Sequence, residues 1–157
     1  MISADTRTSK ARPAPSKPTE YLLRGNSGQL SQVMVYRLVA EGFALRDVQD
    51  MLSISDLYSK KEVLARILGK SIRTFQRQRR SKGQASLNSY QSAVAFQYAT
   101  VLEHAIDIFG TQRLAEEWLG RTCRYLDGDI PLDVIDNPLG FQAVKVYLER
   151  IKYGTYQ

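Results

Sequence analysis

Apolar residues recur at helical spacing along most of this chain, and most of these runs stop at a glycine. A helix places residues i, i+3, i+4 and i+7 on one face, whereas a half-buried strand alternates apolar and polar residues. The 157 residues contain no alternating stretch of useful length. The helical runs, in chain order, cover residues 30–39, 45–52, 63–68, 86–109, 114–119 and 141–151. The sequence therefore predicts an all-α fold.

Residues that favour helix starts mark the boundaries between these runs. Ser59 with Glu62 has the spacing of a capping box, which predicts a helix starting there. Ser71 can cap the following helix, which we expect to reach about residue 81. Thr111 is placed to cap a short helix, and Asn137 precedes a proline that suits the first turn of the last helix.

Composition divides the chain into three parts. Residues 1–20 hold three prolines, six Ser/Thr residues and almost nothing apolar, which predicts a disordered basic tail. The net charge is +9 over residues 1–90 and −3 over residues 91–157. Two surfaces of opposite charge indicate different partners, with phosphates suited to the first. We expect one helical domain over residues 21–85 and a second over residues 86–157.

The basic charge is concentrated in residues 59–82, with nine Lys/Arg residues and one acid. Two short helical patterns meet there at Gly69, and Ala65 stands four residues earlier. A helix-turn-helix needs a small residue where its helices cross and favours glycine in the left-handed turn. The pattern therefore predicts a DNA-binding helix-turn-helix. The side chains expected to face DNA are those of Lys70, Ser71, Arg73, Thr74, Arg77 and Gln78.

The apolar residues of this motif should fill the wedge between its two helices. They are Leu64, Leu68, Ile72 and Phe75. An alternative interpretation is a solvated basic helix that joins two core helices. Because one recognition helix reads a single half-site, we expect a homodimer or a larger assembly. The apolar stripe of residues 30–39 could supply the dimer interface or could equally belong to the intramolecular core.

Residues that carry catalytic chemistry are few. Cys123 is the only cysteine, so no intrachain disulfide can form, and His104 is the only histidine. His104 is best read as an ordinary helix residue, because a metal site needs several such ligands. The chain has no Walker-type loop or dinucleotide glycine pattern. We predict no enzyme activity, no metal and no cofactor.

The sequence also lacks the features of export or membrane insertion. It has no apolar h-region at its N-terminus and no run of about 18 apolar residues. We expect a soluble, cytoplasmic protein with no membrane partner.

The C-terminal third contains an ordered series of short motifs. They are Phe109-Gly110, Trp118-Leu119, Pro131-Leu132-Asp133-Val134-Ile135, Gly140 and Ile151-Lys152-Tyr153-Gly154. This series resembles the toxin-binding domain of Xre/MbcA/ParS-type antitoxins. Upstream, the residues from Ser71 to Arg77 are similar to the recognition helix of the same family. The resemblance extends over about residues 42–157.

The resemblance implies a type II antitoxin that neutralises a RES-domain, NAD-consuming toxin and represses its own operon. Such antitoxins insert C-terminal residues into the active-site cleft of the toxin. By position, the candidate toxin contacts are Arg150, Tyr153, Gly154, Tyr156 and Gln157.

Other interpretations of these residues and of the whole chain stay open. Tyr153 could instead pack the last helix on Trp118, and Tyr156 and Gln157 could be a frayed end. The whole chain could be a plain helix-turn-helix regulator whose C-terminal domain only dimerises. It could also be an RNA- or nucleoid-binding scaffold.

Overall fold

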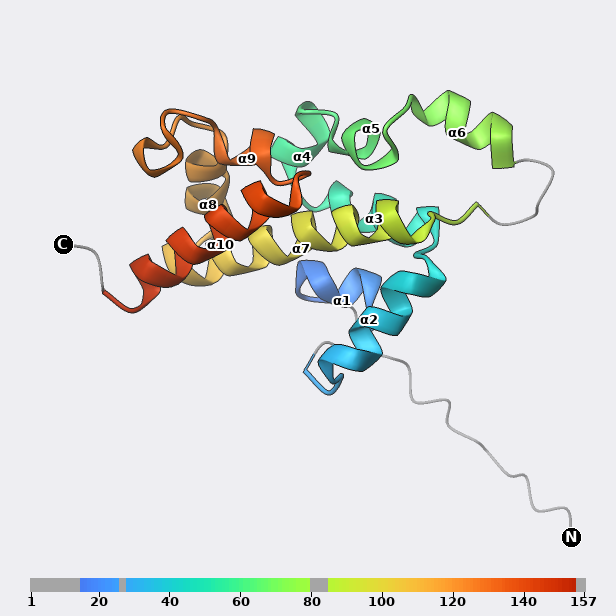
Figure 1. Cartoon of the computed structure of the whole chain (residues 1–157), viewed down its shortest axis with the longest axis horizontal. Coiled ribbons are helices and arrows are strands. Elements are labelled where there is room, and N and C mark those ends of the chain that lie inside the picture. The colour runs from blue at the N-terminus through green and yellow to red at the C-terminus, as the bar shows by residue number, and fades with distance from the viewer. Residues whose placement is uncertain (1–14, 26–27, 80–84, 155–157) are drawn as a thin grey trace, which may run out of the picture.

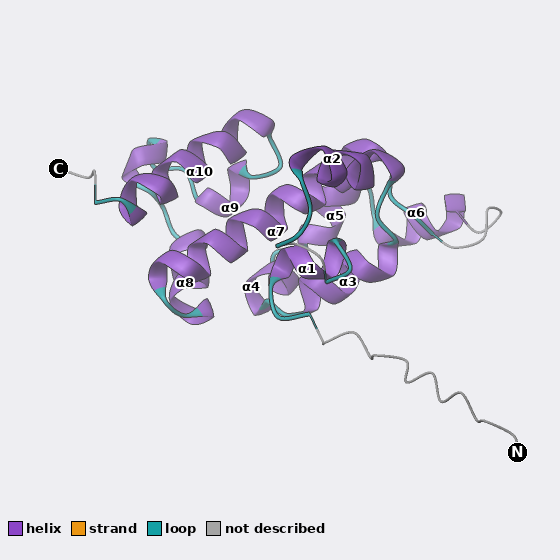
Figure 2. Ribbon diagram, turned by 90° about the horizontal axis from the view of Figure 1, so that it is seen from below, coloured by secondary structure: helices purple, strands orange, loops and turns teal. Residues whose placement is uncertain are grey.

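The structure, a computed structural model, describes residues 15–25, 28–79 and 85–154, and the side chains of Gln78 and Arg79 fall outside that description (Figure 1). Within these ranges the backbone is helical, and β pairing is limited to an isolated bridge between Ala44 and Ser86 (Figure 2). The helices are α1 (Pro18–Leu22), α2 (Gln32–Glu41), α3 (Leu45–Ser53), α4 (Asp56–Lys60), α5 (Val63–Leu68), α6 (Ile72–Arg79), α7 (Ser89–Phe109), α8 (Gln112–Leu119), the 3-10 helix η2 (Arg124–Leu126), α9 (Pro131–Val134) and α10 (Pro138–Lys152). The predicted all-α fold is confirmed.

The long helix α7 is the element on which the others assemble. It packs against α1, α2 and α5, and α8 and α10 lie along its C-terminal half (Figure 1). A reciprocal capping box starts it: the Gln91 N–H donates to Asn88 Oδ1 (2.8 Å), and the Asn88 N–H donates to Gln91 Oε1 (3.0 Å). The predicted start at Ser86 is too early, because Ser86 pairs with Ala44 instead.

Buried apolar side chains from both halves of the chain form one cluster. It extends from Leu22 in α1 to Leu148 in α10, and fully buried Tyr98 and Leu102 of α7 lie within it. Helices from both predicted domains therefore pack on the same central helix. The predicted boundary between residues 85 and 86 stays a prediction.

The helix α1 corrects the prediction of a disordered tail up to residue 20. Pro18 occupies its first turn, where a missing N–H costs nothing. Thr19 is buried, and its N–H and hydroxyl both donate to Glu103 Oε2, at 3.2 and 2.5 Å. The sequence did not predict this helix for two reasons. The prolines favour a disordered segment, and the carboxylate that binds Thr19 lies 84 positions further along the chain. The rest of the predicted tail, residues 1–14, lies outside the described residues.

The predicted capping box of Ser59 and Glu62 is wrong. Ser59 lies inside α4, whose cap is Ser55: the Tyr58 N–H donates to Ser55 Oγ (3.1 Å). The next helix starts at Val63, after Glu62 in a left-handed conformation with φ 52°. Burial of Tyr58 explains the shift, because its hydroxyl donates to the Tyr98 carbonyl (2.7 Å) and thereby fixes α4 against α7.

The C-terminal helices follow the predicted caps. Thr111 Oγ1 accepts from the Leu114 N–H (3.2 Å), and Asn137 Oδ1 accepts from the Gly140 N–H (3.2 Å). A Cβ at Gly140 would overlap the carbonyl oxygen of Val134. Glycine at this position therefore lets α10 approach α9 closely.

Candidate functional site

The helices α5 and α6 are the two for which the sequence predicts a helix-turn-helix. The two helices pack against each other and are joined at Gly69, whose φ of 66° is left-handed. Ser71 caps α6 as predicted, because its Oγ accepts from the Thr74 N–H (3.2 Å). The tight turn and the cap together fix the direction in which α6 leaves α5.

The apolar wedge beneath this motif is smaller than predicted. Leu68 and Phe75 are buried and Leu64 is half-buried, as expected. Ile72 is exposed, which corrects the prediction that it fills the wedge. Ile72 is the first residue of α6 and lines a surface hollow together with Leu64 of α5.

The predicted DNA-facing side chains lie on the surface of this motif. Those of Lys70, Ser71, Arg73, Thr74 and Arg77 are exposed, and the side chain of Gln78 lies outside the described residues. The hydroxyls of Ser71 and Thr74 are 2.7 Å apart and hydrogen-bond to each other, so a phosphate or base would have to compete for them. No acid occurs from Gly69 to Arg79, and α6 lies at one end of the molecule (Figure 1). The helix at this end of the molecule is therefore cationic over its described side chains.

Hydrogen bonds hold this motif to the rest of the protein. Buried Gln91 of α7 donates its Nε2–H to the carbonyl of Leu68, the last residue of α5 (3.0 Å). On the other side, the Arg66 guanidinium lies 2.8 Å from Asp133 Oδ1 at α9. Helices of the second part of the chain, α7 and α9, therefore hold α5, and α6 packs on α5.

A second candidate surface lies at the end of α10. Tyr153 follows the helix and is 72% exposed, and Gly154 continues with a left-handed φ of 63°. The Arg150 guanidinium lies 5.4 Å from the centre of the Tyr125 ring, within the range of a cation–π contact. The other predicted contacts, Tyr156 and Gln157, lie outside the described residues.

The alternative in which Tyr153 packs on Trp118 is wrong. The Trp118 ring stacks on Tyr147 of α10, with ring centres 5.7 Å apart and planes 10° apart. Phe109 lies on it as well, at 5.5 Å. Phe109 and Tyr147 therefore make the ring contacts of Trp118, and the Tyr153 side chain is exposed to solvent.

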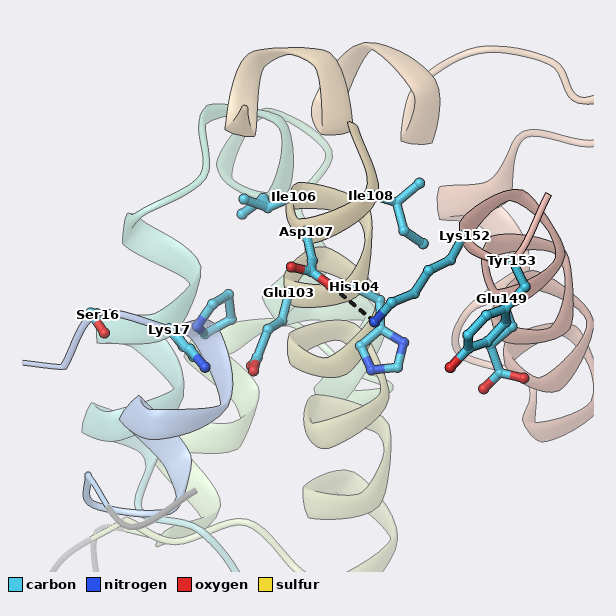
Figure 3. Close-up of a pocket in the computed structure, with 11 residues that line it drawn as sticks. Ser16, Lys17, Glu103, His104, Ile106, Asp107, Ile108, Glu149, Lys152 and Tyr153 are labelled. Carbon is cyan, nitrogen blue, oxygen red and sulfur yellow. Dashed lines mark hydrogen bonds and ion pairs between the residues drawn. The ribbon is translucent and has the colours of Figure 1, made fainter. Parts of the chain in front are cut away.

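A hollow of about 420 Å³ adjoins Tyr153, between α7, α10 and the start of α1 (Figure 3). Lys152 Nζ reaches across from α10 to Asp107 Oδ2 of α7 (3.3 Å), and Tyr153, which follows α10, lies close to Glu149 in its last turn. Burial lowers the pKa of His104 below its usual 6.5, and Lys145 lowers it further, so this imidazole is neutral at pH 7. The hollow thus combines an exposed ring, a neutral imidazole and an ion pair.

Sequence reasoning did not find this hollow. The spacing of Glu103, His104 and Asp107 places them on one face of a helix. That spacing is the sequence pattern from which one wall of the hollow could have been predicted. The opposite wall comes from α10, and the sequence does not reveal how the two helices align.

The described residues offer neither a metal site nor a membrane span. They contain no group of three or more His, Cys, Asp or Glu side chains arranged to hold a metal ion. Among them, no helix combines the length and the apolar character that crossing a bilayer requires.

Comparison with known proteins gives a family for the C-terminal helices. The family model described as the antitoxin Xre/MbcA/ParS C-terminal toxin-binding domain matches residues 104–154. The match includes the end of α7 and all of α8, η2, α9 and α10. It contains most of the residues that line the hollow, whereas Glu103 and the start of α1 lie outside it. No curated protein matches the chain.

Proposed function

Because residues 104–154 belong to the toxin-binding domains of Xre/MbcA/ParS-type antitoxins, we propose that this chain neutralises a RES-domain, NAD-consuming toxin and represses its own operon. The family match carries the antitoxin role. The kind of toxin rests on the resemblance of the C-terminal motifs, and the DNA-binding role rests on the exposed basic helix α6. We assign residues 21–85 to DNA binding and residues 86–157 to toxin binding, and we place the complex in the cytoplasm.

Neutralisation in this proposal is a steric block by the end of α10. Tyr153 offers a large, rigid ring with one polar end, of the kind that anchors many protein interfaces. Gly154 has a left-handed φ, so the chain does not continue the helix there, and the residues that follow are the ones we assign to the active-site cleft of the toxin. Arg150 lies one turn earlier and supplies a cation for an acidic or polar group in that cleft. A steric block of this kind needs no catalysis by the antitoxin.

Repression in this proposal comes from α6 lying in the major groove. Arg73 and Arg77 lie four residues apart, so a helix places both on one side. An Arg side chain there can donate two hydrogen bonds to a guanine edge, while Lys70 and Ser71 at the helix start suit phosphate oxygens. A homodimer would place two such helices on symmetric half-sites.

Isolation of the native complex tests the partner directly. The chain, tagged and expressed from its own operon, should co-purify with a RES-domain protein in a ratio that native mass spectrometry can measure. Purified toxin should consume NAD alone and lose that activity when the chain is added. Recovery of the chain with DNA and no such enzyme would favour the plain transcription regulator instead.

We expect Arg73→Ala or Arg77→Ala to weaken binding to the operon's own promoter by about 1–3 kcal/mol. Each change removes one guanidinium from an exposed helix face and should leave the fold intact. Electrophoretic mobility shift across a salt series measures the effect. Arg113→Ala is the matched control, because Arg113 is an exposed arginine of α8 that pairs with Glu117. Unchanged promoter affinity in both α6 variants would refute the groove assignment, and toxin neutralisation should persist in either case.

A further inference from the structure

The helix α2 exposes an apolar face that the rest of the described chain leaves uncovered. None of its ten residues is buried. Its inner side, with Val35, Leu38 and Val39, packs partly against the core. On its outer side Val33 and Tyr36 are 59% and 70% exposed, and Met34 at the edge is 50% exposed.

Exposure of this kind calls for a partner. A helix of ten residues is marginal in water on its own, so α2 depends on packing for its stability. Clustered large apolar residues on a surface mark interaction sites more often than scattered ones do. Val33, Tyr36, Arg37 and Ala40 follow the i, i+3, i+4, i+7 spacing of a single helix face.

We propose that this face packs against the same face of a second copy of the chain, about a two-fold axis. The inference rests on the proposed DNA-binding function, because a helix-turn-helix with one recognition helix reads only half of a symmetric site. It adds the surface through which the two copies join.

The charge of α2 favours a second copy of the chain over nucleic acid or a membrane as the partner of this face. The α2 segment carries one cation, Arg37, and one acid, Glu41, so it is neutral overall. Nucleic acid requires a cationic surface, and a helix that lies on a membrane is rich in Lys and Arg on its polar side. Two neutral faces can meet without repulsion even though each chain carries a net charge of +6.

Symmetry makes the face complementary to itself. Tyr36 and Arg37 are neighbours at the middle of α2. When two copies run antiparallel about an axis near these residues, Arg37 of each copy meets Tyr36 of the other. Such a pair of cation–π contacts is favourable, and Val33 of each copy then faces the small side chain of Ala40.

The surface beside α2 supplies the remaining area. A ten-residue helix is about 15 Å long, and its outer face alone falls short of the roughly 800 Å² per partner in a stable interface. A hollow of about 430 Å³ adjoins it, lined by apolar residues such as Leu30, Met34 and Phe43 and by two cations and two acids, Arg24, Arg37, Glu41 and Asp47. The edge of α2 therefore continues into a recess of mixed character and balanced charge that a second copy can fill.

Sedimentation analysis of the purified full-length chain, without toxin or DNA, tests the inference. The parent should sediment at twice the 17.8 kDa of one chain at micromolar concentration. Tyr36→Ala should raise the dimer dissociation constant about tenfold or more, and Val33→Glu about a hundredfold. Both side chains are exposed in one copy, so circular dichroism should show unchanged helix content. Leu139→Glu, at an 82% exposed leucine of α10, is the matched control and should remain dimeric.

Two results would overturn the inference: a parent chain that is monomeric at tens of micromolar, or α2 variants that dimerise as tightly as the parent. The proposed function is measured separately, by toxin inhibition and promoter binding. A dimer that is insensitive to both α2 changes would refute this surface and leave the antitoxin role standing. Loss of toxin inhibition by the parent would refute the antitoxin role and leave the dimer measurement unaffected.

Discussion

A chain that ends after Lys152 should fail to protect cells from the co-expressed toxin, while it keeps its affinity for promoter DNA. The truncation leaves α10 complete and preserves the ion pair between Lys152 and Asp107. It removes exposed Tyr153, the turn at Gly154 and the two remaining candidate contacts. The change therefore separates the proposed toxin contact from the packing of the helix that carries it.

The expected loss follows from the size of interface anchors. The truncation removes two aromatic anchor residues, Tyr153 and Tyr156. At about 2 kcal/mol each they give about 4 kcal/mol, or roughly a thousandfold weaker binding to the toxin. Inhibition of purified toxin across a titration measures this loss, and colony counts after toxin induction show its consequence. Tyr153→Ala alone should cost about half as much free energy.

Leu139→Ala is the matched control for the truncation. Leu139 is exposed at the opposite end of the same helix, so its removal should leave protection intact. If the truncated chain protects as well as the parent, the toxin contact lies elsewhere on residues 104–154. Failure of the parent to protect would instead refute the antitoxin role itself.

Local chemistry accounts for the parts of the fold that could be predicted. The turn at Gly69, the stop at Gly110 and the caps at Ser71 and Thr111 each depend on backbone conformation and one side chain within a few residues. Such signals are readable from sequence because no distant partner is needed. The same holds for the buried face of α7 around Tyr98 and Leu102, which follows from helical period alone.

The features that the sequence did not predict depend on contacts between residues that are far apart in the chain. The short helix α1 exists because Thr19 meets Glu103, and α4 ends where burial of Tyr58 places it. Neither contact has a sequence pattern, because each joins residues at least 40 positions apart. The hollow beside Tyr153 has the same origin, since its walls come from α7 and α10.

The apolar stripe of residues 30–39 shows how the two kinds of information combine. The helical period predicted α2, and the two alternatives for the stripe were a dimer interface and intramolecular core. Leu38 and Val39 pack against the core, whereas Val33 and Met34 are exposed. Part of the stripe therefore belongs to the intramolecular core, and the exposed part is the surface that we propose for dimerisation, because the apolar residues cover more than one side of the helix.

Trp118→Ala should lower the free energy of unfolding by about 3–5 kcal/mol, the largest stability change that we predict for one residue. Trp118 is buried between Phe109 and Tyr147, and Tyr147 in turn stacks on Tyr125 at 4.8 Å. Removal of the indole leaves a cavity between α7, α8 and α10 and breaks this chain of ring contacts. Urea unfolding monitored by circular dichroism measures the loss.

Leu114→Ala is the control for this substitution, because it lies on the same helix with its side chain exposed and should change stability by about 0.5 kcal/mol. The Trp118 variant also tests how the two predicted domains depend on each other. Because one buried cluster extends from α1 to α10, we expect a single unfolding transition in which toxin binding and DNA binding weaken together. Retention of full promoter affinity after the C-terminal helices unfold would show instead that residues 21–85 fold as an independent DNA-binding unit.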